Sequence, residues 1–339
     1  MLGILLMPRI VQWERQIGSR LRLRDLFVFF TVVKRGSMTK AAAVLGVSTP
    51  SVSEVIADLE QALGVRLLER TPRGVFVTAY GEALLRRGEA AFDELRQGIN
   101  EIELLSDPTA GEVNVGCPES IATILPPIVD LFRSNYPRAI LGIDHEIFPT
   151  FAPRLRDRSL DLVLMRMRGH DPAGDSAPDD LSVEYLFDDI LILVTGANSE
   201  WAHRRKLKLA DLQHADWILP GRGSWGHRVV GEAFQTHGLD PPRISIKSLS
   251  GHLQANLTGH GNFVTAIALS VFDFYRERFC LKRLPVDLPA RRWPVAVMTL
   301  KGRTLSPVAE RFIDCMRQST KAAPHQTLMT DIAAFPTMT

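Results

Sequence analysis

The sequence predicts a multidomain chain made of a helical N-terminal head, one long linker helix and a C-terminal α/β domain. Three patterns carry this prediction. Within the first 64 positions, apolar residues recur at helical spacing between single glycines, and the proline-free stretch 80–105 has a repeat of about 3.5 residues. Beyond Gly111, short apolar runs alternate with helical patterns. A chain of 339 residues is long enough for roughly two to three domains.

Charge is unevenly distributed along the chain. The whole chain holds 40 Lys and Arg against 38 Asp and Glu, a formal net charge of +2. Residues 1–87 hold 13 Lys and Arg against 7 Asp and Glu, so the remaining residues carry a net charge of −4. The basic first quarter therefore favours a polyanionic partner such as DNA.

Several classes of protein are not supported by the sequence. Cys117, Cys280 and Cys315 form no CxxC pair, so we expect neither a zinc site nor a disulfide framework, and the Cys117 thiol is expected to be inert. No P-loop, nucleophile elbow or HExxH motif indicates an enzyme, a cofactor or a metal site. No apolar run approaches the roughly 18 residues of a membrane span, so we expect a cytoplasmic protein with no membrane partner.

The head shows a helix-turn-helix pattern. The first helix is expected to end at Gly36, the second to be capped by Ser37 and to end at Gly46, and the third to follow the cap Ser48 and end at Gly64. The apolar stripes of the first and third helices are Leu26, Phe29, Phe30 and Val33, and Val52, Val55, Ile56 and Leu59.

The outer side of the third helix is the candidate DNA-reading surface, because its apolar stripe faces the core. Its residues are Thr49, Pro50, Ser51, Ser53 and Glu54. Two β-prone runs around the turn 72–74 then predict a wing, where Arg70 and Arg73 can neutralise phosphates or enter the minor groove. A small helical bundle with a solvated basic face is the alternative interpretation.

A family resemblance favours the DNA-binding interpretation. Residues 23–85 read LRDLFVFFTVVKRGSMTKAAAVLGVSTPSVSEVIADLEQALGVRLLERTPRGVFVTAYGEALL, which closely resembles the winged helix-turn-helix of the LysR-type transcriptional regulators. The resemblance implies that residues 23–79 bind double-stranded promoter DNA. Where the family usually has Gln, this chain has Thr49, which lacks the bidentate adenine contact. Where the family usually has Ala, it has Ser51. Glu54 replaces a basic or amide residue, and it either accepts from cytosine N4 or pairs with a neighbouring Arg.

The stretch 80–106 is expected to be a single helix. Its repeat consists of Leu84, Gly88, Ala91, Leu95, Gly98, Ile102 and Leu105. This spacing is typical of a coiled-coil seam, although the helix could also pack only on its own domain. In LysR-type regulators this linker helix pairs two heads. The resemblance therefore implies a homodimer held by Leu84, Ala91, Leu95 and Ile102, and a homotetramer in the assembled regulator.

The C-terminal part predicts parallel sheets built from βαβ units. The expected strands are 113–116, 139–143, 160–165, 189–194, 217–219, 244–246 and 263–267, and the expected helices include 124–136, 225–238 and 249–259. The fragments GCPESIATILPPIVDLFRSNYP, LRDRSLDLVL and LTGHGNFVTAI resemble the two-lobed effector domain of the same family, which has the fold of periplasmic solute-binding proteins.

That resemblance implies a division of the chain. The effector-binding domain covers residues 111–319, with lobe I formed by 111–167 and 290–319 and lobe II by 187–289. An N-terminal extension, 1–22, and a C-terminal tail, 320–339, flank these parts.

Small effectors of this fold bind between the lobes. Ser120 follows the first strand near a helix start, and Ser224 occupies the equivalent place in lobe II, where N–H groups favour an anion. Arg222 could clamp a carboxylate or point into solvent, and Ser120 could be only a helix cap. Thr150 and Thr265 fall at positions where the family lines its cleft. A small carboxylate or related anion is the expected effector.

Together these observations predict a sequence-specific DNA-binding transcriptional regulator controlled by a small effector. Two alternatives remain open from the sequence. One is an effector-independent architectural protein with a vestigial ligand cleft, and the other is an enzyme or solute-binding protein with an incidental helical head.

Overall fold

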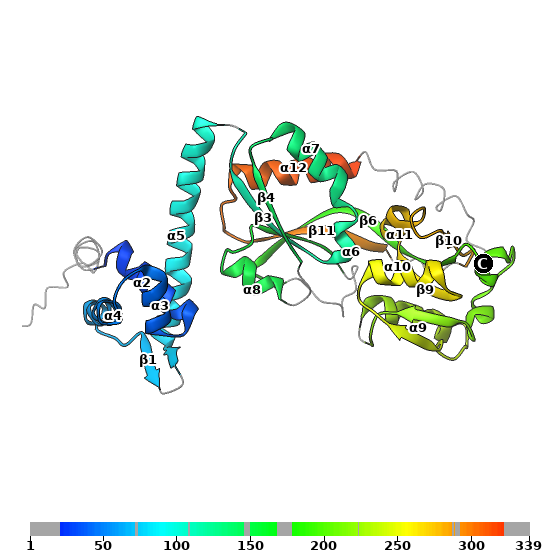
Figure 1. The fold of residues 1–339 in the computed structure, drawn as a ribbon, viewed down its shortest axis with the longest axis horizontal. Helices are drawn as coiled ribbons and strands as arrows, with labels where there is room; N and C mark the ends of the chain where they lie inside the picture. Colours follow the sequence, from blue (N-terminus) through cyan, green and yellow to red (C-terminus); the bar gives the residue numbers. More distant parts are fainter. Residues whose placement is uncertain are drawn as a thin grey trace, which may run out of the picture. The chain divides into compact units, whose positions relative to one another are not determined.

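The chain forms two compact units, residues 1–96 and 97–339, and each is described by itself. The computed structural model describes residues 21–71, 74–107, 109–145, 150–167, 178–222, 224–286, 288 and 292–321. Except for residues 21–22 and 320–321, the expected extension and tail lie outside the described residues. Figure 1 shows the helices and strands of both units.

Three helices form the head, as the glycine punctuation predicts. They are α2 (Leu23–Arg35), α3 (Met38–Leu45) and α4 (Thr49–Leu63). Gly36, Gly46 and Gly64 end them in the left-handed conformation, which glycine adopts without a Cβ clash. The hydroxyls of Ser37 and Ser48 accept hydrogen bonds from backbone N–H groups three residues later, so both predicted caps are confirmed.

The head is completed by a two-stranded wing and the start of a long helix. The strands β1 (Leu68–Thr71) and β2 (Gly74–Val77) are antiparallel. A Glu60 carboxylate oxygen accepts hydrogen bonds from the N–H groups of Leu67, at 2.7 Å, and Leu68, at 3.0 Å, which fixes the wing to α4. These contacts orient the wing relative to the third helix of the head.

The long helix α5 (Ala79–Ser106) begins where the Thr78 hydroxyl accepts from the N–H of Gly81. Its first half packs on the head through Gly88. A Cβ at this position would lie 2.2 Å from Cζ of Phe30, so only glycine allows the contact. Phe30 also meets Phe92 edge to face at 5.5 Å. The glycine that weakens the predicted seam therefore has a packing role inside one protomer.

Lobe I is a sheet covered on both faces. Its parallel strands are β3 (Glu112–Cys117), β4 (Ile140–His145) and β5 (Leu162–Arg166). One face packs under α7 (Leu125–Asn135) and α12 (Pro307–Lys321), and the other under α8 (Phe151–Arg156). The short helix α6 (Glu119–Ala122) follows β3 directly.

Lobe II repeats this arrangement. Its parallel strands are β7 (Asp216–Leu219), β8 (Ile244–Lys247) and β9 (Phe263–Ala268). The helix α9 (Trp225–Thr236) covers one face, and α10 (Gly251–His260) and α11 (Leu269–Tyr275) cover the other. Two short 3-10 helices, η1 (Glu200–His203) and η2 (Leu209–Leu212), follow the strand that enters the lobe.

Two long antiparallel strands join the lobes, which corrects the expectation of purely parallel sheets. They are β6 (Leu181–Gly196) and β11 (Arg292–Leu300), and β10 (Leu281–Arg283) pairs with β6. The strand order is β4-β3-β5-β11-β6-β9-β7-β8. The sequence predicts only residues 189–194 of β6, because the preceding part carries polar residues such as Glu184 on a partly exposed face.

No single helix in the described part of the chain is both long and apolar enough to cross a membrane. The helices α3 and α4 meet this length and composition criterion only when they are taken together, and the two are bent by 108° relative to each other.

Candidate functional site

The outer face of α4 presents the residues that the sequence singles out for DNA contact. Pro50, Ser51 and Glu54 are exposed, and Thr49 and Ser53 are partly exposed. Val52, Ile56 and Leu59, on the opposite side, are each 1% exposed. The hydroxyls of Ser48 and Ser51 lie 2.8 Å apart, which orients the first turn of the helix. The five side chains thus share one accessible surface.

The basic residues around this face are only partly described. Arg70 lies in β1 opposite Val75, but its side chain, like all of Arg73, lies outside the described residues. Five other cations of residues 23–79 are exposed and were not singled out by the sequence: Arg24, Lys34, Arg35, Lys40 and Arg66. Their only signal in the sequence is the overall basic charge of the head.

The second half of α5 carries an exposed apolar stripe. Leu95, Ile99, Ile102 and Leu105 are between 48% and 86% exposed, and the spacing of three to four residues puts them along one side of the helix. Of the residues predicted for dimerisation, Ala91, Leu95 and Ile102 are exposed, whereas Leu84 packs partly against the head core. The sequence pattern missed Ile99, because it assigned the seam to the neighbouring Gly98.

Arg166 lies at the centre of the junction between the two lobes. Its Nε and Nη2 donate to Oδ2 of Asp189 at 3.1 and 3.0 Å, and its Nη2 also donates to the hydroxyl of Ser270 at 2.7 Å. Its Nη1 donates to the hydroxyl of Ser120 at 3.1 Å. Ser120 belongs to lobe I and Ser270 to lobe II, so one buried guanidinium connects both lobes.

Glu119 makes a second connection between the lobes. Its Oε1 accepts hydrogen bonds from the hydroxyl of Ser250 and the N–H of His252, both at 3.0 Å. Ser250 caps α10 of lobe II, so the carboxylate of lobe I occupies a helix N-terminus, where negative charge is favoured. Beside it, a Cβ on Gly251 would lie 3.8 Å from Cβ of Ser120, so α6 and α10 approach each other closely.

Two tryptophans close one side of the junction. Trp225, the first residue of α9, stacks on Trp293 of β11 with ring centroids 4.1 Å apart. The Arg166 guanidinium lies over the Trp293 ring at 5.2 Å from its centroid. The junction therefore combines a stacked tryptophan pair with hydroxyl groups and one neutralised cation.

The other predicted effector residues are placed differently from Ser120. Ser224 caps α9, and its hydroxyl accepts from the N–H of His227 at 3.4 Å. Arg222 and Thr150 are exposed. Thr265 is fully buried and donates its hydroxyl proton to the carbonyl of Ile218 at 2.7 Å, because β9 lies between β6 and β7. Thr265 is thus buried with its hydroxyl already bonded, while Ser120 lies at the lobe junction. The sequence missed Glu119, Arg166, Asp189 and Ser270.

A cavity of about 250 Å³ lies elsewhere, in lobe I between α12 and the strands β6 and β11. Its lining includes Glu184, Glu310, Asp314 and Arg317 and none of the predicted effector residues. Arg317 binds both carboxylate oxygens of Glu184, at 2.6 and 2.7 Å, and thereby lowers the pKa of that carboxyl. This polar cavity is therefore partly filled by its own ion pair.

Two of the three cysteines, Cys117 and Cys315, are buried free thiols. Burial raises the pKa of Cys117 to about 11, and burial also raises the pKa of Cys315. Both thiols are therefore protonated at neutral pH, which removes the nucleophilic form. Within the residues that the structure describes, no three His, Cys, Asp or Glu side chains are grouped to hold a metal ion.

Known protein families and proteins are similar to this chain over most of its length. Residues 23–82 match the family described as bacterial regulatory helix-turn-helix protein, lysR family, and residues 106–321 match the LysR substrate binding domain. The chain is similar to the HTH-type transcriptional regulator GbpR of Azospirillum brasilense, with 26% identity over 92% of this chain and 90% of GbpR. It is also similar to the HTH-type transcriptional regulator TdcA of Escherichia coli K12, with 29% identity over 73% of this chain and 77% of TdcA.

Solved structures show the same fold. A full-length single-residue variant of OxyR from Pseudomonas aeruginosa aligns with a TM-score of 0.63 at 20% identity, over 90% of this chain and 96% of that one. Full-length CbnR complexed with its target DNA aligns with a TM-score of 0.51 at 23% identity, over 88% of this chain and 99% of that one.

Proposed function

The chain belongs to the LysR family of bacterial transcriptional regulators, and we propose that the outer face of α4 reads its operator and that the lobe junction binds its effector. It is a DNA-binding regulator and not an enzyme. We place it in the cytoplasm, where bacterial DNA lies. The effector domain extends over residues 111–319, with lobe I at 111–167 and 290–319 and lobe II at 187–289.

The single observation that carries the DNA-binding proposal is the exposed face of α4. It offers the hydroxyls of Thr49, Ser51 and Ser53 and the carboxylate of Glu54 to base edges in the major groove. Glu54 can accept from cytosine N4 but repels phosphate, so it favours a cytosine at one operator position. Arg70 and Arg73 of the wing region supply phosphate contacts, which position the head without reading sequence.

The effector proposal rests on the lobe-bridging contacts of Glu119 and of Arg166, whose guanidinium also binds Ser120. A ligand between the lobes changes their relative stability only if it binds the open and closed arrangements differently. Glu119, through Ser250 and His252, and Arg166, through Ser270, already make contacts that exist only when the lobes meet. A ligand that takes over these contacts therefore shifts the lobe equilibrium directly.

The position of Glu119 indicates the effector's chemistry. A carboxylate already fits the N-terminus of α10, with the Ser250 hydroxyl and the His252 N–H as donors. A small organic carboxylate can replace Glu119 there, beside Ser120 and Gly251, where α6 and α10 approach each other. Glu119 then acts as an internal competitor of the effector.

We propose that two protomers pair through the exposed stripe of α5, including Ala91, Leu95, Ile99 and Ile102. Pairing removes this apolar surface from water and presents two heads to two half-sites of one operator.

Two experiments test this function: selection of bound duplexes from a random DNA library, and a screen of small carboxylates for binding. The full-length chain should retain a defined duplex sequence from a random library, with protection of two half-sites in a footprint. Small carboxylates should raise its Tm, and Ser120→Ala should abolish that rise without lowering the Tm of the free protein by a comparable amount. Retention of every duplex equally would overturn the DNA-reading proposal. If none of a broad panel of carboxylates raised the Tm, the architectural alternative would be favoured instead.

A further inference from the structure

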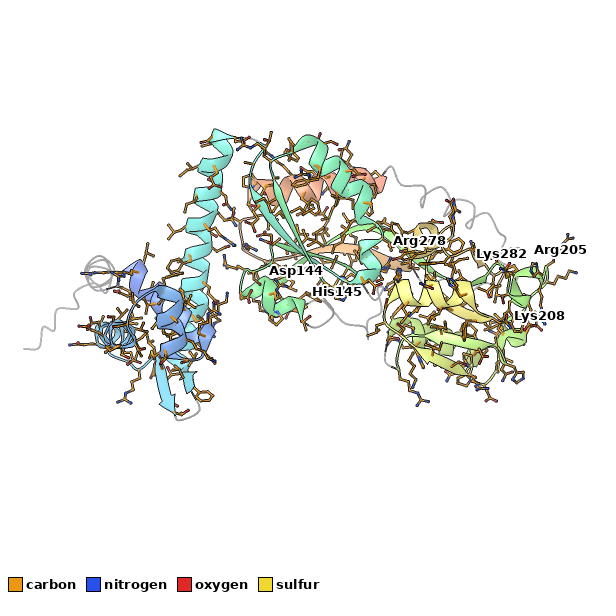
Figure 2. The ribbon with its side chains drawn as sticks, viewed as in Figure 1. Asp144, His145, Arg205, Lys208, Arg278 and Lys282 are labelled. Carbon is orange, nitrogen blue, oxygen red and sulfur yellow. The ribbon has the colours of Figure 1, made fainter. Side chains whose placement is uncertain are left out.

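Lobe II carries a group of exposed cations that neither the operator site nor the lobe junction uses. They are Arg205, Lys206, Lys208, Arg278 and Lys282, which we call the lobe II basic patch. Figure 2 shows Arg205, Lys208, Arg278 and Lys282 along one side of lobe II. The first three residues of the patch lie between η1 and η2, and the last two lie next to or within β10.

The fold brings these two segments together. Lys282 pairs with Thr195 in the antiparallel ladder between β10 and β6. The N–H of Ala197, just after β6, donates to the carbonyl of Cys280 at 2.7 Å. The chain then enters η1 and reaches Arg205 within a few residues. Cations that are far apart in sequence thus share one surface.

The patch concentrates positive charge in a part of the chain that is otherwise acidic. Residues 200–212 and 273–283 together hold eight Lys and Arg against four Asp and Glu, whereas residues 88–339 as a whole carry a net charge of −4. Arg204 pairs with Glu200 at 3.7 Å and Arg276 with Asp273 at 3.8 Å. In the part of the chain that the structure describes, none of the five patch residues forms an ion pair. Their charges are therefore available to a partner.

We propose that the lobe II basic patch binds the phosphate backbone of DNA flanking the operator. The inference rests on the DNA-binding function proposed above. Because heads and lobes belong to one chain, binding of an operator by the heads raises the effective concentration of flanking duplex for the lobes, so weak contacts suffice. Each Lys or Arg that neutralises a phosphate releases a counterion, and no base needs to be read.

The composition of the patch favours DNA over an acidic protein. Three of its five residues are Lys, which is depleted in protein interfaces but is common at phosphates. The patch residues are spread over the loop between η1 and η2, the turn after α11 and the strand β10, as expected for contacts that follow a charged backbone. The experiment must therefore distinguish binding to DNA from binding to an acidic protein.

The experiment compares two full-length variants with the wild type. The patch variant combines Arg205→Gln, Lys208→Gln and Lys282→Gln. The matched control combines Arg228→Gln, Arg243→Gln and Lys247→Gln, which removes three exposed cations from α9, β8 and its preceding loop in the same lobe. Equal Tm values of the three proteins verify that each one folds.

Two duplexes carry the operator selected by the wild type. The short duplex ends at the footprint of the heads, and the long one adds about two helical turns of unrelated sequence on each side. For the wild type, log K should fall more steeply with log salt concentration on the long duplex, by roughly 0.9 for each additional phosphate contacted. The patch variant should lose this difference and bind the long duplex about tenfold more weakly at low salt, while the control variant keeps both properties.

The outcomes are distinct. If the wild type selects no duplex, the proposed function itself fails. If it binds the short duplex but gains no salt dependence on the long one, only the patch inference fails. A patch variant that binds both duplexes like the control, yet regulates transcription poorly, would assign the patch to an acidic protein and overturn the proposal.

Discussion

Arg166 and Asp189 form an ion pair with an Nη2 to Oδ2 distance of 3.0 Å, and both side chains are only 3% exposed. Asp189 accepts further hydrogen bonds from the Ser270 hydroxyl at 2.7 Å and from the Ile190 N–H at 3.0 Å. Every strong polar group of the pair is therefore satisfied inside the protein. Removing one partner of such a buried pair therefore destabilises the fold far more than replacing both partners with apolar residues.

The first prediction concerns this pair. Asp189→Asn should lower the free energy of unfolding of the effector domain by about 3–5 kcal/mol, because Arg166 is left as a buried charge without a counterion. The double variant Arg166→Met/Asp189→Leu should recover most of this loss. The matched control is Asp180→Asn, which breaks an ion pair with Arg156 whose side chains are 45% and 48% exposed, and it should cost less than about 1 kcal/mol. Urea unfolding measures all three, and equal losses for the two single variants would contradict the buried-pair argument.

A second prediction compares two glycines of the same helix. Gly88→Ala should destabilise the head by about 1–3 kcal/mol, because the new Cβ overlaps the Phe30 ring. Gly98→Ala meets no atom within 4 Å and should stabilise α5 by up to about 1 kcal/mol through helix propensity. Thermal unfolding of both variants checks the opposite signs. A Gly88→Ala protein as stable as the wild type would show that the head does not pack on α5 in this way.

The outer face of α4 leads to a third prediction. Ser53→Ala should weaken binding to the selected operator by about tenfold while leaving the affinity for unrelated duplexes unchanged, because a base contact and not a phosphate contact is lost. Ser134→Ala, an exposed serine of α7, serves as the control. Competition binding at fixed salt separates the two affinities. A uniform loss on all duplexes would remove Ser53 from the set of base-reading residues.

The stripe on α5 leads to a fourth prediction. Replacing Leu95 and Ile102 by Ser should raise the dimer dissociation constant by at least about 100-fold, since each buried aliphatic side chain contributes roughly 1.5–3 kcal/mol. Tyr80→Ser removes another exposed apolar residue from the start of the same helix and should leave the dimer intact. Sedimentation velocity over a range of concentrations gives the comparison, and a dimer that survives the double substitution would place the interface elsewhere.

Glu184 provides a prediction about pH. Its folded-state pKa is lowered by Arg317, so the pair stabilises the fold above the ordinary Glu value of about 4.3 and loses this contribution as the pH falls through the lowered pKa. Both side chains are more than two-fifths exposed, so the contribution at pH 7 is below about 1 kcal/mol. Glu184→Gln should therefore be slightly less stable at neutral pH and equal to the wild type in acid. A stability difference that persists unchanged below the lowered pKa would exclude the ion pair as its source.

The sequence predicts the head well because its signals are local. Ser37 and Ser48 bond to N–H groups three residues away, and Gly36, Gly46 and Gly64 act through their own backbone conformation. Such features are set by neighbours in the chain, so a spacing pattern is sufficient to find them.

The lobe junction depends on long-range contacts that no local pattern contains. Arg166 meets partners 23, 46 and 104 positions away, so its role becomes visible only after the lobes are assembled. The contact of Thr265 is equally long-range, because its hydroxyl donates to the carbonyl of Ile218, 47 positions away in the paired strand β7.

The two strands that join the lobes also have a mechanical consequence. β6 and β11 pair continuously from Leu181 with Leu300 to Ile190 with Arg292, with one irregularity between Val295 and Ala296. At the lobe boundary this pair is a narrow ribbon, and two-stranded ribbons adopt a larger twist than broad sheets. The ribbon can therefore act as a torsion hinge whose ladder stays intact while the lobes turn. Across this hinge the lobes are held together by side-chain contacts, those of Glu119 with Ser250 and of Arg166 with Ser270.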